Sequence, residues 1–267
     1  ALVVGDVNST LACSIVAKKM GVKVIHVESG IRSGDISMPE EVNRIVTDSI
    51  TDYFFTTSVT ANRNLVKSGV SSDKIFFVGN TMIDTLLKNK HKFKKPMIWD
   101  DFLLNKNQYI ILTLHRPSNV DDSKKLSLLL KLIIKACRNL KVVFPLHPRT
   151  KKVMTKIKLK SEKIIYTEPL SYLEFNFLVE NAMAVITDSG GITEETTILG
   201  IPCLTMRSNT ERPETVDVGT NELIGNNLNL IGDAISKIIA GNWKKGSIPE
   251  KWDGKAAERI VSQIIKF

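Results

Sequence analysis

Short apolar runs alternate with amphipathic stretches along almost the whole chain. Apolar runs separated by segments of helical periodicity are typical of βαβ units, in which helices connect parallel strands. We therefore predict an α/β fold with parallel sheets flanked by helices. The expected strands are at residues 1–5, 23–27, 53–56, 75–78, 109–114, 141–145, 163–166, 184–187 and 202–206. The expected helices are at residues 9–20, 39–49, 59–68, 81–88, 123–138, 150–159, 171–180, 191–199 and 256–266.

A polar, Lys-rich stretch at residues 88–106 interrupts this alternation. We interpret it as the connection between two Rossmann-like lobes, because a chain of 267 residues is long enough for two domains. We predict a first lobe at residues 1–90, a second lobe at 91–252, and a C-terminal helix at 253–267 that crosses back to the first lobe. Residues 1–5 have the pattern of a buried strand already in progress, so we expect the first lobe to be truncated at its N-terminus.

The chain carries 37 Lys and Arg residues against 28 Asp and Glu residues, which gives a formal net charge of +9. Basic proteins that bind nucleic acid usually combine a dense basic stripe with aromatic side chains. Here the basic residues are mostly Lys and are scattered over expected helix faces, as at residues 123–138. We therefore expect a Lys-rich surface and no nucleic acid partner.

The apolar segments and the cysteines indicate in which cellular compartment the protein is expected. No apolar run reaches the length that spans a bilayer. Cys13, Cys137 and Cys203 lie in apolar segments without CxxC or metal-ligand spacing, which favours reduced, buried thiols. We therefore expect a cytoplasmic protein with no membrane partner and no metal site.

The expected strand at 184–187 leads into the segment DSGGITEE. Ligands of parallel sheets bind beyond the carboxyl ends of the strands, and a helix N-terminus offers N–H groups to phosphates. Ser189, Gly190 and Gly191 therefore form a candidate phosphate cradle, and Glu194 or Glu195 is placed to bind ribose hydroxyls. An ordinary turn with a Ser cap is the structural alternative, and the acidic pair shifts the balance toward a nucleotide site.

A charged loop follows the next expected strand. Within it, Pro213 restricts the preceding Arg212 to an extended conformation. A fixed arginine there is suited to orienting a phosphate or a base. A surface loop with internal ion pairs explains the same residues equally well.

Several ionisable residues follow other expected strands. Asp6, Glu28 and Glu40 come from the first lobe, and His115 directly follows the strand at 109–114. Each acid has a structural alternative: Asp6 as a helix cap, Glu28 as a partner of Arg32, and Glu40 as a first-turn acid. Carboxylates that share one sheet edge repel one another unless they handle protons or bind cations. Together they favour a proton-transfer site.

Eight segments carry a resemblance to a known family. In chain order they are GDVNST, HVESGIRSGD, MPEEVNR, VGNTMIDTLL, TLHRPSN, PLHPRT, TDSGGITEE and TERPE. The chain resembles the non-hydrolysing UDP-N-acetylglucosamine (UDP-GlcNAc) 2-epimerases, whose fold is similar to that of the GT-B glycosyltransferases. Members of that family have a further βα segment before the strand that ends in Gly-Asp.

The resemblance implies roles for particular residues. Acid/base roles fall to Asp6, Glu28, Glu40 and His115. The UDP-sugar is bound by Phe175, Ser189, Gly190, Gly191, Glu195 and Arg212. Arg116 and His147 are the candidates for a regulatory site that binds a second UDP-GlcNAc. The resemblance further implies a homodimer without a cofactor, with UDP-GlcNAc, UDP-ManNAc and UDP as its ligands.

The implied reaction is inversion at C2 of the sugar for cell-surface polysaccharide synthesis. The C2 hydrogen is too weakly acidic for simple removal, whereas elimination of UDP gives a glycal to which UDP can add again. The sequence leaves three alternatives open: a GT-B glycosyltransferase, a hydrolysing epimerase and an inactive nucleotide-binding remnant. It also leaves the exact sugar open, because related epimerases act on other acetamido UDP-hexoses.

Overall fold

The computed structural model describes residues 1–157, 159, 161–225 and 227–267. Internal contacts divide the chain into two compact units, which are described separately. The first unit comprises Ala1–Lys88, Glu211–Glu214 and Pro249–Phe267, and the second comprises Asn89–Thr210 and Thr215–Ile248. The segment Glu211–Glu214, which lies within the predicted second lobe, therefore groups with the first unit.

The first unit contains a parallel sheet of four strands in the order β1-β2-β3-β4. The strands are β1 (Leu2–Val4), β2 (Ile25–Ser29), β3 (Tyr53–Thr56) and β4 (Ile75–Phe77). The helices in this part of the chain are α1 (Asn8–Lys19), α2 (Pro39–Ser49), α3 (Val59–Lys67), the 3-10 turn η1 (Ser72–Lys74), α4 (Thr81–Asn89) and α13 (Ala256–Ile264).

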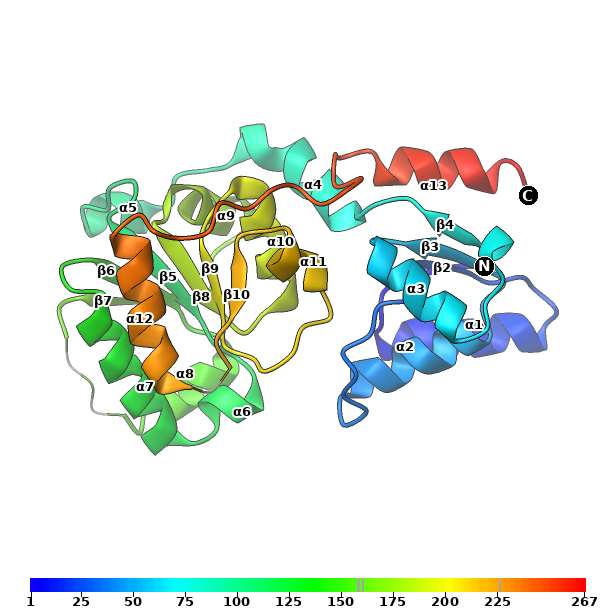
Figure 1. Cartoon of the computed structure of the whole chain (residues 1–267). Helices are drawn as coiled ribbons and strands as arrows, with labels where there is room; N and C mark the ends of the chain where they lie inside the picture. The colour runs from blue at the N-terminus through cyan, green and yellow to red at the C-terminus, as the bar shows by residue number, and fades with distance from the viewer. Residues whose placement is uncertain (158, 160, 226) are drawn as a thin grey trace. The chain divides into compact units, whose positions relative to one another are not determined.

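Helix α13 covers one face of this sheet, and α1 and α2 lie on the opposite side (Figure 1). Ile260 of α13 packs with Val27, Phe55 and Val78 in a buried cluster. The helix is amphipathic, and the C-terminal segment is anchored before it because the buried indole of Trp252 donates a hydrogen bond to a backbone carbonyl of the first unit. The last helix of the chain thus completes the core of the first unit.

The second unit contains a parallel sheet of six strands in the order β10-β9-β8-β5-β6-β7. The strands are β5 (Tyr109–Thr113), β6 (Lys141–Pro145), β7 (Ile164–Thr167), β8 (Ala184–Thr187), β9 (Cys203–Thr205) and β10 (Asn221–Leu223). The helices are η2 (Lys90–Lys92), α5 (Met97–Asp101), α6 (Pro117–Val120), α7 (Ser123–Ala136), α8 (Pro148–Met154), α9 (Tyr172–Asn181), α10 (Gly190–Leu199), α11 (Pro213–Asp217) and α12 (Leu228–Ile239).

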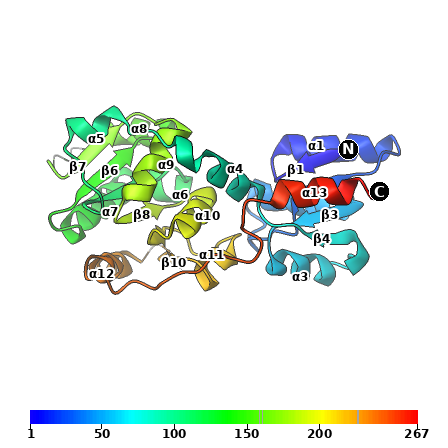
Figure 2. The same cartoon turned by 90° about the horizontal axis from the view of Figure 1, so that it is seen from above.

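Both faces of this sheet are buried. Ile110 and Leu112 of β5 belong to a core with α7 and α12, whereas Tyr109 and Ile111 pack with α9 on the other face. Figure 2 shows the same layers from above. Strands covered by helices on both faces need a nearly continuous apolar run, which is the pattern seen in the sequence. The predicted α/β fold of parallel sheets flanked by helices is confirmed.

The strand order creates a switch point between β5 and β8. From β5 the chain adds β6 and then β7 on one side, and it then returns to place β8 on the other side. Adjacent connections at such a point leave the sheet in opposite directions and open a crevice at the carboxyl ends of the strands. His115 and Ser189 lie in the segments that follow β5 and β8. Two candidate residues are therefore at this switch point.

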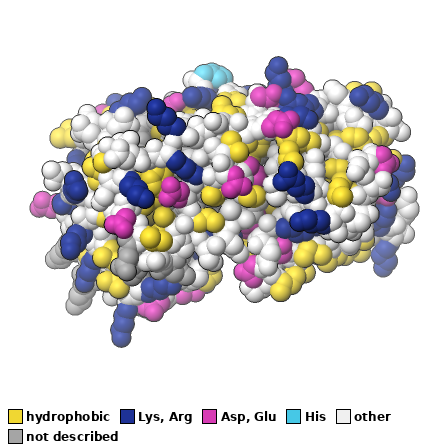
Figure 3. Space-filling view, in the orientation of Figure 1, with side chains coloured by type: hydrophobic (Ala, Val, Ile, Leu, Met, Phe, Trp, Pro, Cys, Tyr) yellow, Lys and Arg dark blue, Asp and Glu magenta, His cyan; other side chains and the backbone are white. Residues whose placement is uncertain are grey.

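Two expectations about the surface can be examined in the structure. Cys137 and Cys203 are buried, but Cys13 is exposed, so the prediction of three buried thiols is wrong for Cys13. Cys13 lies in α1, which is not amphipathic, so the apolar residues around Cys13 in sequence do not gather on one buried face. Lys and Arg side chains are spread over the face shown in Figure 3 among acidic side chains. In the described part of the chain, no helix is both long and apolar enough to cross a membrane.

Candidate active site

Arg44 of α2 gathers carboxylates of the first unit. Its Nε and Nη2 donate to Oδ2 of Asp6 at 2.9 and 2.6 Å, and its Nη1 donates to Oε2 of Glu41 at 2.7 Å. Glu211 lies 3.7 Å from the same guanidinium. Asp6 is not the cap of α1, whose N-cap is Val7. One buried arginine therefore offsets the repulsion among three acids.

Glu28 lies at an irregularity of β2. Its φ is +69°, a left-handed conformation that is costly for a residue with a side chain. Its carboxylate pairs with Nη2 of Arg212 at 3.3 Å, and both side chains are largely buried. Arg32, considered as a partner for Glu28, pairs instead with Asp48 at 2.6 Å. The structure thus brings together Glu28 and Arg212, which the sequence assigned to different tasks.

The two adjacent glutamates of α2 have different surroundings. Glu40 is exposed in the first turn of the helix. Glu41 is buried, and it accepts hydrogen bonds from the backbone N–H groups of Ser33 and Gly34. Burial tends to raise the pKa of Glu41, but these hydrogen bonds and the guanidinium of Arg44 outweigh it and lower the pKa. The sequence analysis did not predict these contacts of Glu41.

The turn after Glu28 requires a glycine. Gly30 has φ of +77°, and a Cβ at this position would lie 2.5 Å from the carbonyl oxygen of Ala61. We expect Gly30→Ala to destabilise the protein by about 2 kcal/mol or more, because it adds a steric clash to an unfavourable φ. Urea unfolding checks this. The control is Gly21→Ala, where φ is +72° but nothing lies within 4 Å of the added Cβ. Equal losses in the two variants would contradict the clash.

Asp188 organises the candidate residues of the second unit. It is fully buried after β8. Its carboxylate accepts hydrogen bonds from the backbone N–H groups of His115 and Arg116 and from the Asn119 amide, and it lies 2.8 Å from Nδ1 of His115. Burial tends to raise the pKa of Asp188, but the hydrogen bonds from His115 and Asn119 outweigh this effect, so the pKa lies below its ordinary value. Asp188 therefore fixes the orientation of the His115 ring.

A cavity of about 210 Å³ lies beside this histidine, at the carboxyl ends of β5 and β6. Four candidate residues line it: His115, His147, Phe175 and Ser189. The rings of His115 and His147 have centroids 5.5 Å apart. Nε of Arg116 donates to the carbonyl oxygen of Asp188 at 3.0 Å, which places the second regulatory candidate next to this site. Residues far apart in the sequence thus converge on one small cavity.

The N-terminus of α10 adjoins Ser189. The helix begins at Gly190, and the side chain of Ser189 makes no capping hydrogen bond. The first N–H groups of a helix lack partners within the helix and carry a partial positive charge. The predicted cradle of Ser189, Gly190 and Gly191 is therefore at a helix terminus that is suited to an anion.

Glu195 lies one turn further along α10. Its side chain is buried, and the amide of Asn176 lies 3.5 Å from Oε1. Burial raises the pKa of Glu195, although hydrogen bonds with Asn176 and Tyr172 act in the opposite direction. Burial of this carboxyl group therefore costs free energy that its hydrogen bonds do not fully offset. Groups buried at such a cost are often found at binding sites.

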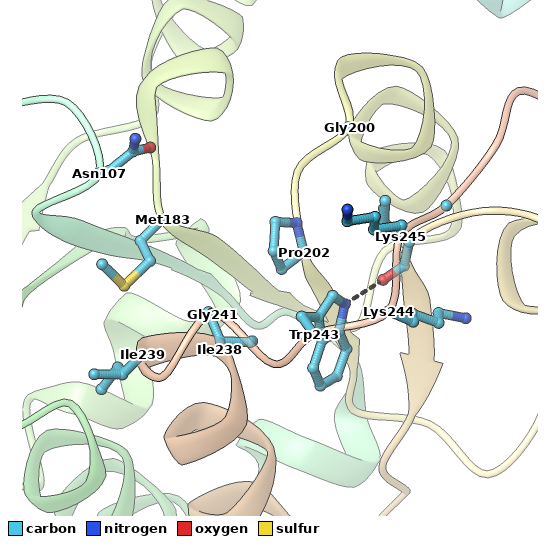
Figure 4. A pocket seen from close by; sticks show the side chains of 12 residues that line it. Asn107, Met183, Gly200, Pro202, Ile238, Ile239, Gly241, Trp243, Lys244 and Lys245 are labelled. Atoms are coloured by element: carbon cyan, nitrogen blue, oxygen red, sulfur yellow. Dashed lines mark hydrogen bonds between the residues drawn. The ribbon is translucent and has the colours of Figure 1, made fainter.

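A larger cavity, of about 550 Å³, lies at the opposite edge of the six-stranded sheet. Figure 4 shows Trp243 and Pro202 at its centre, with Lys245 to one side. Its lining includes Asn107, Met183 and Thr220, which directly precede strands or lie two residues before one. Ligands of parallel sheets bind at the carboxyl edge, and none of the candidate residues lines this cavity. The candidate residues of the second unit therefore lie at the smaller cavity and not at this one.

The fold and the site define a class of protein. Two α/β units with parallel sheets, one of which has a helix N-terminus at its switch point, are characteristic of GT-B-like enzymes. A family model described as UDP-N-acetylglucosamine 2-epimerase matches residues 1–265. The chain belongs to this family.

Curated relatives and solved structures agree with this assignment. The chain is 42% identical to UDP-N-acetylglucosamine 2-epimerase of Methanocaldococcus jannaschii, over 97% of this chain and 73% of the relative. It is 36% identical to UDP-2,3-diacetamido-2,3-dideoxy-D-glucuronate 2-epimerase of Pseudomonas aeruginosa, over 100% of this chain and 74% of the relative. A crystal structure of the M. jannaschii enzyme in complex with UDP-GlcNAc and UDP matches with a TM-score of 0.83 and 40% identity, over 98% of this chain and 75% of that one.

Proposed function

We propose that this protein interconverts UDP-GlcNAc and UDP-ManNAc without hydrolysing them, in the supply of precursors for cell-surface polysaccharide. The match of residues 1–265 to the epimerase family carries this proposal. Two relatives, 42% and 36% identical to this chain, bear the names of 2-epimerases. These names do not favour a glycosyltransferase, a hydrolysing enzyme or an inactive remnant.

The nucleotide half of the substrate belongs to the second unit in this proposal. Ser189 and the N–H groups at Gly190 and Gly191 bind the diphosphate, because the helix terminus stabilises negative charge. Glu195 accepts hydrogen bonds from the ribose hydroxyls. Phe175, which lines the cavity, contacts the nucleotide.

Arg212 supplies a further positive charge to the nucleotide. Its Nη2 atom pairs with the carboxylate of Glu28, so the same guanidinium touches a proposed acid/base group. Charge that develops on the departing diphosphate is stabilised by a positive charge of this kind. UDP is thereby held ready for its return to the sugar.

The proton transfers belong to Asp6, Glu28, Glu40 and His115. One base removes the proton from C2 while the bond between C1 and the UDP oxygen breaks, which leaves a C1–C2 double bond. UDP then adds to C1 again, and an acid delivers a proton to C2 from the other face. The reaction therefore needs one proton-handling group on each face of the sugar.

Three finer properties are also proposed. Arg116 and His147, beside the small cavity, take part in regulation by a second UDP-GlcNAc. The protein acts in the cytoplasm, where the thiols of Cys13, Cys137 and Cys203 stay reduced. It acts as a homodimer, which size measurement in solution can examine.

Solvent deuterium tests the reaction. The protein is incubated in deuterated water with UDP-GlcNAc, and in parallel with UDP-2,3-diacetamido-2,3-dideoxy-D-glucuronate. We expect UDP-ManNAc with deuterium at C2, and no free sugar. Accumulation of UDP-ManNAc that lacks deuterium would overturn the elimination route. Turnover of the second substrate alone would keep the epimerase but change its sugar, and release of ManNAc would identify a hydrolysing enzyme.

Glu195→Gln tests the ribose contact. The pKa of Glu195 is raised in the folded state above its ordinary value of 4.5. The contribution of Glu195 to the stability of the protein therefore falls as the pH rises above 4.5. At neutral pH the variant should therefore be at least as stable as the wild-type protein. It should also gain less from UDP, since ligand stabilisation scales with affinity. Thermal unfolding with and without UDP measures both effects.

The matched control is Glu180→Gln, because Glu180 is a partly exposed acid that pairs with Lys90. Surface pairs of this kind contribute little, so neither stability nor the UDP effect should change. An undiminished UDP effect in Glu195→Gln would remove Glu195 from the nucleotide site.

A further inference from the structure

A cluster of three ionisable residues, two of them buried, lies close to the acids of the first unit. His26 is on β2, Asp48 is near the end of α2, and Arg32 follows β2. His26 is fully buried and Asp48 is 5% exposed. We infer that His26 and Asp48, with Arg32, are positioning residues that hold Asp6 and Glu28 at a fixed separation. This inference rests on the proposed function for the roles of Asp6 and Glu28.

The hydrogen bonds of His26 define its protonation. Nδ1 lies 2.7 Å from Oδ1 of Asp48, and Nε2 lies 2.9 Å from the carbonyl oxygen of Gly5. A carbonyl oxygen only accepts, so Nε2 carries a proton. An ionised carboxylate also only accepts, so Nδ1 carries one too. A ring that donates from both nitrogens is an imidazolium cation.

The other contacts of Asp48 support its ionised form. Its Oδ2 accepts a hydrogen bond from the backbone N–H of Gly30 at 3.1 Å and pairs with Nη1 of Arg32 at 2.6 Å. A carboxyl group beside a guanidinium strongly favours its charged form. Asp48 is therefore a buried carboxylate between two cations, and all of its contacts are donors.

This arrangement forms a continuous path between the two proposed acid/base residues. The path runs from the Gly5 carbonyl through His26 and Asp48 to the N–H of Gly30. Gly5 directly precedes Asp6, and Gly30 follows Glu28 by two residues. The two ends are the loops that leave β1 and β2 at the carboxyl edge of the sheet. The cluster thus fixes one loop against the other.

The path also explains how Glu28 keeps its costly backbone conformation. A left-handed φ persists in a residue with a side chain only where the surroundings enforce it. Asp48 holds the N–H of Gly30, and the amide of Asn64 donates to the carbonyl oxygen of Gly30 at 3.0 Å. Gly30 is therefore tied on both sides, directly after the strained residue.

A purely structural role is the competing explanation. Breaking a buried ion pair destabilises a protein whether or not it positions other groups. Stability alone therefore does not distinguish the two, whereas turnover and substrate binding do. Displacement of a reacting group by about 1 Å costs about 100-fold in rate, with little change in contacts that bind the nucleotide.

The first experiment examines the cluster without reference to activity. The wild-type protein is labelled with ¹⁵N-histidine, and the ring signals of His26 are assigned with the variant His26→Gln. These signals report whether both ring nitrogens donate, as the hydrogen bonds to Asp48 and to the carbonyl oxygen of Gly5 require. We expect both ring nitrogens of His26 to carry protons. A neutral ring in the wild-type protein would overturn the inference.

The second experiment compares Asp48→Asn with Asp52→Asn. Asp52 is a matched control because it also pairs with a cation, Lys18, and accepts a backbone N–H, that of Val24, but at the amino edge of the same sheet. We expect Asp48→Asn to lower kcat about 100-fold with KM changed less than about threefold. Asp52→Asn should retain its kcat.

The outcomes separate the inference from the function on which it rests. An equal kcat in the two variants, or a rise in KM alone, would overturn the positioning role while the epimerase stands. A wild-type protein that does not epimerise any UDP-sugar tested would refute the proposed function. The ring signals of His26 would still show whether both of its nitrogens carry protons. If Asp48→Asn does not fold, His26→Gln takes its place in the comparison of kcat and KM.

Discussion

Glu28→Gln is expected to lower turnover of UDP-GlcNAc by a factor of about 10² to 10⁴ while UDP binds almost as well as before. The amide has the size of the carboxylate and keeps an oxygen for Arg212, whose Nη2 lies 3.3 Å from Oε2 of Glu28. It has no basicity with which to remove or return a proton at C2. The loss therefore falls on kcat. Epimerisation assays and calorimetry with UDP measure the two quantities.

Glu258→Gln is the control for this variant. Glu258 is exposed on α13 of the same unit, so the same change of charge occurs away from the proposed acids. Its turnover should match that of the wild-type protein. If Glu28→Gln loses UDP binding together with turnover, Glu28 is a structural partner of Arg212 and not an acid/base group.

Asp188→Asn is expected to reduce kcat about 10³-fold, by analogy with serine proteases in which the acid that orients the catalytic histidine becomes an amide. An Asn in this position presents an N–H to Nδ1 of His115 and so selects the wrong tautomer. The same variant should lose about 3 kcal/mol of stability, because several buried donors lose a charged acceptor. Epimerisation assays and urea unfolding at pH 7 measure these changes.

The pH dependence gives Asp188 a second signature. Its pKa is lowered in the folded state, so its carboxylate stabilises the protein above its ordinary pKa of 3.8, and this contribution disappears as the pH falls further. The stability difference between the wild-type protein and Asp188→Asn should therefore shrink below about pH 4. Asp121→Asn removes an exposed partner of Arg149 and should cost little. A difference that stays constant with pH would contradict an ionised Asp188.

The sequence predicted the central strands well because they are buried on both faces. Their apolar runs are nearly continuous, as in Tyr109–Thr113, and a loop or a surface helix rarely has this pattern. Other elements lacked such a signal. Strand β10 has three residues, two of them polar. Helix α12 was missed although its apolar residues recur with helical periodicity, because Gly232 in its first half weakens the helix propensity. Helix α5 lies within the connector at 88–106 and was not predicted, because a helix of five residues is too short to show helical periodicity.

The candidate site was predicted in part. Strand ends identified His115 and Ser189, since parallel strands deliver the residues that follow them to one edge. Pairings between side chains distant in sequence were not accessible in this way. Asp188 contacts His115 across 73 positions, and Arg44 reaches Asp6 across 38. Neither pairing follows from periodicity, because the sequence shows which edge a residue occupies but not which neighbour it contacts.

The position of α13 also has a consequence for biosynthesis. Ile260 of α13 completes the cluster of Val27, Phe55 and Val78, yet a ribosome adds it long after these three residues. During translation the four-stranded sheet therefore has one apolar face uncovered until α13 has been synthesised. Such faces are prone to aggregation in nascent chains. Chaperone dependence during synthesis is therefore expected of the first unit more than of the second, whose sheet and both covering layers come from one nearly continuous stretch.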